Sequence, residues 1–155
     1  MPAVAADPFV LLPADSNQAL GIAQFAIDFL KGSLGSGPSK AVLDRTELFH
    51  TDSVFCGISA LALRTNAPRV LRAEALTYPA ASGETGACVF GSAERVKSEK
   101  AIVANSSAVR EWDSNGTNFG FNPARGNTAG EFGHNDFYPV VIAACQELGL
   151  DGATA

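Results

Sequence analysis

The residues best suited to proton chemistry lie in one stretch of the chain, between Asp113 and His134. His134 comes just before an apolar segment that predicts a helix, so its imidazole would lie where the helix dipole and open N–H groups attract anions. A neutral imidazole there can accept or donate a proton near neutral pH. A solvent-facing or structural histidine fits the same pattern, so the residue type alone leaves both interpretations open.

Asp113 follows the predicted end of a helix, where a negative charge is electrostatically unfavourable. The next residues, Ser-Asn-Gly-Thr, can fold back and hydrogen-bond to its carboxylate, and a simple Asx turn explains the same sequence equally well. Thr117 and Asn115 are therefore either turn formers or ligands to the oxygens of a bound carboxylate.

Two arginines near this stretch could hold an anionic substrate, because a guanidinium donates two parallel hydrogen bonds to a carboxylate. Arg125 lies within the stretch and is the preferred candidate for substrate binding. Arg110 is instead expected to pair on the surface with Glu111 or Glu131. A metal site is not expected, since Glu131 and His134 have no second histidine nearby and no helical ligand spacing.

The stretch that carries these candidates is predicted to be a long loop. Residues 113–135 contain five glycines, five asparagines and one proline, a composition that disfavours regular structure. Long loops within compact domains are usually functional or disordered. The aromatic Phe119, Phe121 and Phe132 argue that this loop is anchored.

The rest of the chain predicts helices that would position the loop. We expect an arm over residues 1–15 and a helical domain over residues 16–155, with an all-α fold and the long loop before the last helix. Ala87 to Phe90 is expected to be extended. The predicted helices run from Asp15 or Ser16 to Lys31, from Ser39 into the 60s with a break near His50 to Ser53, from Arg69 to Leu76 after a stop at Asn66-Ala-Pro68, from Glu99 to Glu111 with Ser98 as cap, and from Phe137 to Leu148 with Asp136 as cap.

Composition excludes several classes of function. The formal net charge of -5 and the scattered Lys and Arg residues argue against nucleic-acid binding. There is no apolar run of the length that a membrane span needs. The cysteines Cys56, Cys88 and Cys145 are widely spaced and read as small buried residues of a reducing compartment. The chain start does not resemble a signal peptide, which favours the cytoplasm.

The carboxy-terminal third carries a family resemblance. The run AIVANSSAVREWDSNGT, the glycine-rich loop and GHNDFYPVVIAACQELGLDG resemble the MmgE/PrpD family, in which a helix ends in an Asp-containing turn and a loop leads to a histidine before an Ala-rich helix. HTDSVFCGISAL and ACVFGSAERV resemble earlier family segments in the same order. The resemblance covers Gln18 to Gly152.

The resemblance implies a function at a carbon next to a carboxylate. The family includes 2-methylcitrate dehydratases, cis-aconitate decarboxylases and iminodisuccinate epimerases. By this comparison, Asp113 and His134 are catalytic, with His134 moving the proton, and Thr117 closes the Asp turn and binds substrate. Arg125 and Asn115 are added as substrate ligands on residue type and position alone. The resemblance further implies a homodimer, no cofactor and a small di- or tricarboxylic acid as substrate. The alternatives are an epimerase-like isomerase and a non-catalytic helical assembly module.

Two departures from the family pattern bear on the reaction. Many members have an Asp-Phe-Asp-Asp-Thr turn where this chain has Asp113-Ser-Asn-Gly-Thr117, and the histidine here is followed by Asn135 and Asp136 rather than Pro-Ser. The turn therefore carries two fewer carboxylates. Family members are also longer and have a second, lid domain, so we expect this chain to be one part of a larger protein.

Overall fold

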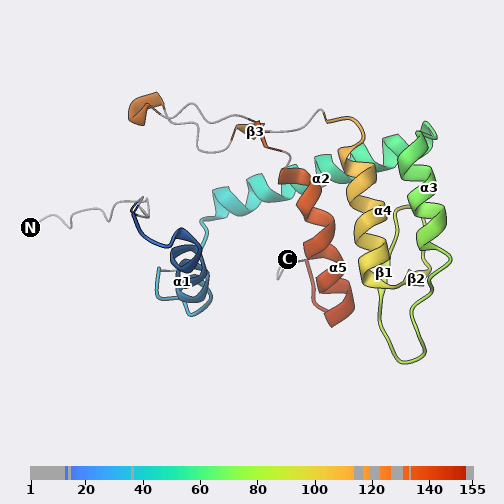
Figure 1. Ribbon diagram of the computed structural model, residues 1–155, viewed down its shortest axis with the longest axis horizontal. Helices are drawn as coiled ribbons and strands as arrows, with labels where there is room; N and C mark the ends of the chain where they lie inside the picture. Colours follow the sequence, from blue (N-terminus) through green and yellow to red (C-terminus); the bar gives the residue numbers. More distant parts are fainter. Residues whose placement is uncertain are drawn as a thin grey trace, which may run out of the picture. The chain divides into compact units, whose positions relative to one another are not determined.

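The computed structural model describes residues 13, 15–35, 37–113, 117–118, 123–126, 131–132 and 134–152. Most of these residues are helical (Figure 1). They belong to two compact units, residues 1–43 and residues 44–155, and each is described here by itself. The predicted helical class is confirmed, with two short β-ladders added to it. The arm expected over residues 1–15 lies almost entirely outside the described residues.

The first unit contains helix α1, Gln18–Leu30. The side chain of Asn17 caps it by accepting a hydrogen bond from the Leu20 N–H at 3.3 Å, so the expected cap at Asp15 or Ser16 is wrong by one or two residues. Asn and Ser are equally good caps, and the sequence alone does not rank them. None of the side chains of α1 is buried. Its large exposed apolar residues are Leu20, Ile22, Phe25, Ile27, Phe29 and Leu30.

Helix α2, Lys40–Ala62, begins in the first unit and continues into the second. The break expected between His50 and Ser53 is absent. Ser53 is buried, and its hydroxyl donates to the Phe49 carbonyl at 2.8 Å, so this polar side chain is satisfied within the helix itself.

The end of α2 is a Schellman motif with an unusual residue in it. The Arg64 N–H donates to the Leu61 carbonyl at 3.0 Å, and the Thr65 N–H donates to the Ala60 carbonyl at 3.1 Å. The position between them needs a left-handed backbone and is usually glycine. Here it is Arg64, with φ of 58°, a conformation that costs an L-residue roughly 1–2 kcal/mol.

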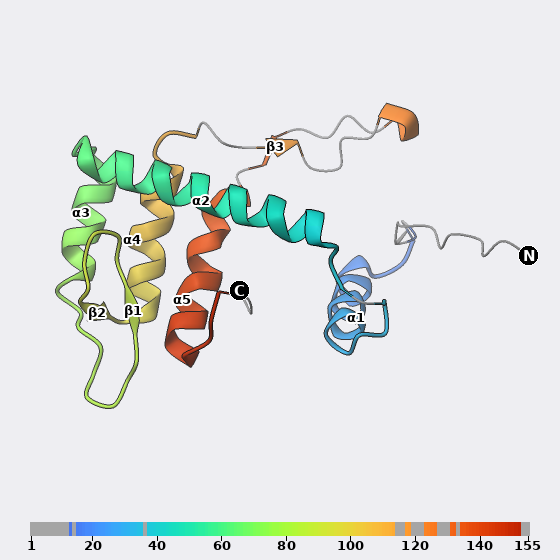
Figure 2. The same cartoon turned by 180° about the vertical axis from the view of Figure 1, so that it is seen from behind.

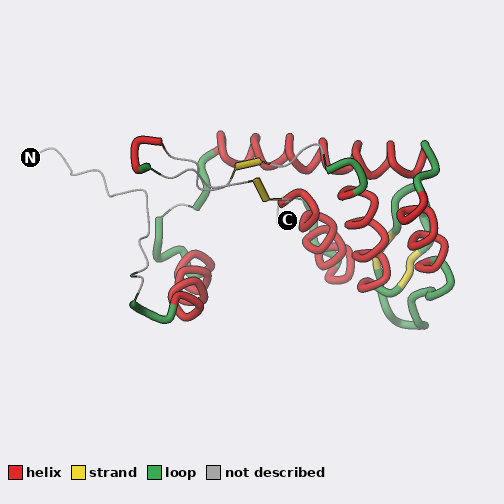
Figure 3. The backbone as a smooth tube through the Cα atoms, turned by 45° about the horizontal axis from the view of Figure 1, so that its top comes forward, coloured by secondary structure: helices red, strands yellow, loops and turns green. Residues whose placement is uncertain are grey.

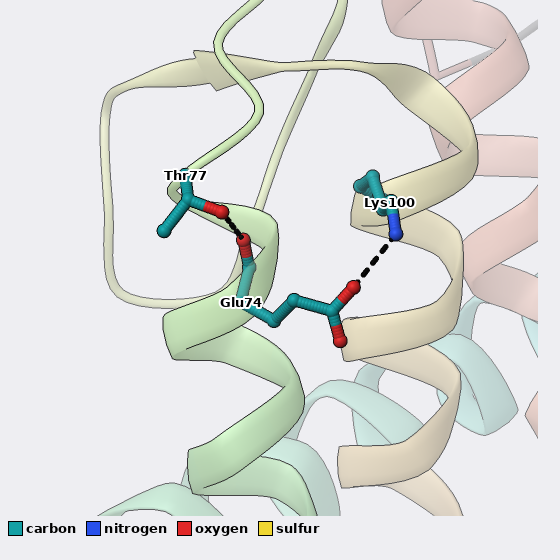
Figure 4. A network of polar contacts seen from close by, with 3 residues as sticks. All are labelled: Glu74, Thr77 and Lys100. Atoms are coloured by element: carbon teal, nitrogen blue, oxygen red, sulfur yellow. Dashed lines mark hydrogen bonds and ion pairs between the residues drawn. The ribbon is translucent and has the colours of Figure 1, made fainter.

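Helix α3, Asn66–Ala75, contains Pro68 in its first turn. Helix α2 ends before Asn66-Ala-Pro68, as expected, but the next helix begins at Asn66 and not at Arg69. Proline is tolerated in this first turn, where backbone N–H groups have no intrahelical partner. An ion pair links α3 to the next helix: Lys100 Nζ lies 2.7 Å from Glu74 Oε1 (Figure 4). This contact raises the pKa of Lys100, and the ammonium also lies 4.2 Å from the centre of the Tyr78 ring.

Helices α4, Ser98–Arg110, and α5, Tyr138–Leu148, complete the second unit. In Figures 1 and 2, α3, α4 and α5 lie side by side beneath α2, and Figure 3 shows the same helices from another angle. Their core is made of small side chains, which allow helices to approach closely. The core residues are Ala75, Ala87, Val89, Val96, Ala101, Ala104 and Ala143.

The expected helix caps in this unit differ from the observed ones. Lys97 precedes α4, and the Ser98 hydroxyl donates to the carboxylate of Glu147 on α5 instead of capping its own helix. Asp136 lies inside a 3-10 turn, η2, His134–Phe137, and Phe137 takes the N-cap position of α5. The Asp136 carboxylate therefore does not cap α5 and can contact a residue outside that helix.

Strands β1, Ala87–Cys88, and β2, Arg95–Val96, form an antiparallel pair. The extended backbone expected from Ala87 to Phe90 is thus confirmed for the first two residues, whereas Phe90 lies in a turn. Between α4 and α5, β3, Thr117–Asn118, pairs with β4, Glu131–Phe132. The 3-10 turn η1, Pro123–Arg125, lies between them in sequence. None of the helices described is both long and apolar enough to cross a membrane.

Side chains from three helices hold residues 88–91, which we call the clamped segment. Arg72 of α3 donates from Nε to the Phe90 carbonyl at 2.7 Å and from Nη2 to the Gly91 carbonyl at 2.9 Å. Gln146 of α5 accepts from the Cys88 N–H at 2.9 Å. The segment thus obtains from side chains the hydrogen bonds that a wider sheet would supply.

Asn105 of α4 provides the most buried of these contacts, with only 8% of its surface exposed. Its Oδ1 accepts from the Phe90 N–H at 2.9 Å, and its Nδ2 donates to the Cys88 carbonyl at 3.0 Å. The Phe90 ring then packs on α2 at Gly57, where an added Cβ would lie 2.6 Å from the ring. One amide therefore fixes both the strand and the aromatic ring that follows it.

Replacing Asn105 with alanine should destabilise the protein by about 2–6 kcal/mol, because two partly buried backbone groups would lose their partners at roughly 1–3 kcal/mol each. Urea unfolding followed by circular dichroism measures this. Val103→Ala on the same helix, where the side chain is 51% exposed, is the control and should cost less. Equal losses from the two variants would contradict the role of the amide.

Candidate functional site

The end of α4 and the start of η2 meet at Arg110. Its Nη1 lies 2.9 Å from Asp113 Oδ1 and 3.5 Å from Asp136 Oδ2. One turn earlier on α4, the Ser106 hydroxyl donates to the Asp136 carbonyl at 2.9 Å. The structure thus brings the Asp113 turn to the segment that begins with His134, although 21 positions of sequence separate the two residues.

The observed partners of Arg110 correct the sequence analysis. Surface pairing with Glu111 or Glu131 was expected, and the guanidinium contacts Asp113 and Asp136. Among the described residues it forms no ion pair with Glu111, and the side chain of Glu131 lies outside what the structure describes. Arg110 is half exposed, so each contact alone contributes little to stability, on the order of 0–1 kcal/mol. Its geometric role is larger, because one cation with two carboxylates joins both ends of the loop.

Asp113 has a left-handed backbone, with φ of 47°. Its N–H donates to the Arg110 carbonyl at 3.0 Å, which closes the last turn of α4. Asp tolerates this conformation better than most residues, yet it remains uncommon outside glycine. The helix therefore turns sharply at Asp113, and the carboxylate is left 64% exposed beside Arg110.

The β3–β4 pair closes the loop near its base. Thr117 is opposite Phe132, and Asn118 is opposite Glu131. Thr117 follows Asp113 by four residues, and Phe132 precedes His134 by two. Three of the predicted site positions, Asp113, Thr117 and His134, therefore belong to two chain segments that run next to each other.

Nothing described about the other two predicted substrate ligands, Arg125 and Asn115, adds to this arrangement. Arg125 is the last residue of η1. Asn115 lies outside the described residues. The side chains of Thr117, Arg125 and His134 also lie outside what the structure describes, so their roles stay predictions.

His50 is a candidate that sequence reasoning did not favour. It lines a small cavity of about 80 Å³ together with Ser53, Asn105 and Tyr138. Its ring centre lies 5.6 Å from that of Tyr138, and its Nδ1 is buried with no hydrogen-bond partner among the described residues. The spacing of His50 to the buried Ser53 and Gly57 places it on the inner face of α2, and that periodicity was the available signal.

Tyr138 is the first residue of α5, directly after η2. Burial raises the pKa of its phenol above the ordinary value near 10. The neutral phenol is therefore the form present at physiological pH, next to His50.

The shifted pKa of Tyr138 predicts a loss of stability in alkali. The folded state holds the phenol proton more tightly than the unfolded state, so this contribution is complete below pH 10 and disappears as the pH rises through the folded pKa. Tyr138→Phe should remove that part of the alkaline loss, measured as melting temperature between pH 8 and pH 11.5. Tyr78→Phe is the control, and the idea fails if both variants keep the wild-type profile.

In the part of the chain that the structure describes, no three His, Cys, Asp or Glu side chains are grouped as a metal site would require. Comparison with protein-family models, with curated proteins and with solved structures finds no match to this chain.

Proposed function

We propose that this chain is part of a lyase or isomerase of the MmgE/PrpD type, acting on a small di- or tricarboxylic acid. The observation that carries the proposal is the meeting of the Asp113 turn with the His134 segment through Arg110. The family resemblance assigns chemistry to these same two segments. An acid or base and a carboxylate ligand must lie together for proton transfer next to a carboxylate.

In the proposed reaction, the His134 imidazole removes a proton from the carbon next to a carboxylate. In an elimination, the electrons of that C–H bond form a C=C bond as the neighbouring C–O bond breaks, and an acid protonates the leaving hydroxide to give water. In an epimerisation, the proton returns to the opposite face of the same carbon. Both versions share the first step, which requires a neutral imidazole.

Arg110 and Asp113 are proposed to bind and orient the substrate. A guanidinium that already bridges two carboxylates can exchange one of them for a substrate carboxylate. Asp113, which is exposed beside it, is the carboxylate that is better placed to move, because Asp136 is the more buried of the two. Thr117, Asn115 and Arg125 remain proposed ligands from the loop, and no cofactor is needed for either reaction.

We further propose a homodimer of cytoplasmic location. The apolar side chains of α1, none of which is buried within the described chain, favour a protein partner for this helix. The same observation favours the second candidate function, a helical assembly module without catalytic activity. The two candidates differ in whether the Asp113 to His134 site binds carboxylates.

His134→Gln should abolish proton exchange between solvent and substrate. The assay is NMR in D₂O, with citrate, 2-methylcitrate and cis-aconitate as probes, and the signal is deuterium incorporation next to a carboxylate. A loss of general acid–base catalysis corresponds to about a 10²–10⁴-fold lower rate. If His50→Gln abolishes exchange while His134→Gln retains it, the histidine assignment is wrong. An absence of exchange and of carboxylate binding in the wild-type protein favours the assembly module.

Arg110→Gln should lower the exchange rate, because glutamine cannot replace the charged contact between the guanidinium and a substrate carboxylate. The free energy of unfolding should change by less than about 1 kcal/mol, because ion pairs of a half-exposed arginine contribute little to stability. Arg45→Gln, an exposed arginine on α2, controls for the lost charge. A rate equal to that of wild type for Arg110→Gln would refute its role in substrate binding.

A further inference from the structure

Three arginines line one open pocket in the second unit, away from the residues assigned to proton transfer. The pocket has a volume of about 490 Å³ and lies where α2 ends, α3 begins and the clamped segment passes. This size is within the usual range for small-molecule sites. The charged lining residues are Arg64, Arg69 and Arg72, and the apolar ones include Ile58, Leu61 and Phe90.

The charge of this lining is entirely positive. No Asp or Glu is among the residues that line the pocket. Neither Arg64 nor Arg69 forms an ion pair with any carboxylate that the structure describes. The whole chain has 11 Lys and Arg against 16 Asp and Glu and is therefore negative. The lining of this pocket is positive, because it has three arginines and no Asp or Glu. Such a lining attracts anions.

Arg72 is held in place before any ligand arrives. Its Nε and Nη2 donate to the carbonyls of Phe90 and Gly91. A guanidinium has five N–H donors, so most of them remain after these two bonds. A cation fixed by the backbone loses little freedom when it binds an anion, and this preorganisation favours affinity.

Arg64 occupies a strained position at the mouth of the same pocket. The Schellman motif at the end of α2 favours glycine there, and the chain has arginine with φ of 58°. Backbone strain of this kind concentrates at functional sites.

We propose that this pocket binds an organic phosphate, a phosphate ester with an aromatic or aliphatic body. Three guanidinium groups match the charge and the several oxygens of a phosphate better than a single carboxylate. Phe90, Leu61 and Ile58, which is 47% exposed, offer the apolar surface for the body of the ligand. The site is separate from the proposed carboxylate site, and neither proposal depends on the other.

The test is calorimetric titration of the full chain with phenyl phosphate, adenosine diphosphate and inorganic phosphate. Saturable binding of the two esters, tighter than that of inorganic phosphate, is expected because only the esters contact the apolar lining. The double variant Arg64→Gln/Arg69→Gln should weaken ester binding about 100-fold, since each lost charge-assisted hydrogen bond corresponds to roughly a tenfold change. The absence of saturable binding, or equal affinity for inorganic phosphate, overturns the proposal.

The matched control is Lys31→Gln/Arg45→Gln, which removes two positive charges from exposed positions outside the pocket. It should bind phenyl phosphate as wild type does. Equal weakening by both double variants would mean that net charge alone attracts the ligand, and the pocket assignment would be wrong.

Arg64→Gly separates binding from folding. Glycine relieves the left-handed strain, so this variant should melt at a higher temperature than wild type and bind phenyl phosphate about tenfold more weakly. A higher melting temperature with unchanged affinity would show that Arg64 takes no part in binding, and would overturn its assignment to the site.

Discussion

The clamped segment, residues 88–91, is the constraint on which the second unit depends. Its strand partner is only two residues long, so most of its backbone groups must find hydrogen bonds elsewhere. Arg72, Asn105 and Gln146 supply them from α3, α4 and α5. Each helix is thereby tied to the same short stretch of backbone, and the rotation of each helix about its axis is set by one polar side chain. Small alanines between the helices then permit the close approach that these bonds require.

The geometry of the candidate site depends on how the clamped segment orients α4. Asn105 and Arg110 belong to the same helix, so fixing the first orients the second. Arg110 then contacts Asp113 at its own end of the loop and Asp136 at the other. These two contacts, together with the pairing of β3 with β4, hold the two ends of the loop next to each other.

The helices could be predicted from the sequence more accurately than their end residues or the contacts between them. The periodic apolar residues and the Gly/Asn-rich stretch predicted the helices and the loop, because those signals are local. The cap at Asn17 was missed because neighbouring polar residues have similar propensities, and Pro68 was misread because proline suits a first turn as well as a stop. The partners of Arg110 depend on which helices pack together, which no local pattern reports. The neighbours of His50 on α4 and α5 likewise depend on packing, although its position on the inner face of α2 follows from helical spacing.

The small side chains of the core have a thermodynamic consequence. The largest completely buried side chains among the described residues are valines, a proline and a serine. Unfolding such a core exposes less apolar surface than unfolding a core of leucine and phenylalanine, and the heat-capacity change of unfolding scales with that surface. The stability of the second unit should therefore vary gently with temperature, with a broad maximum rather than a sharp one.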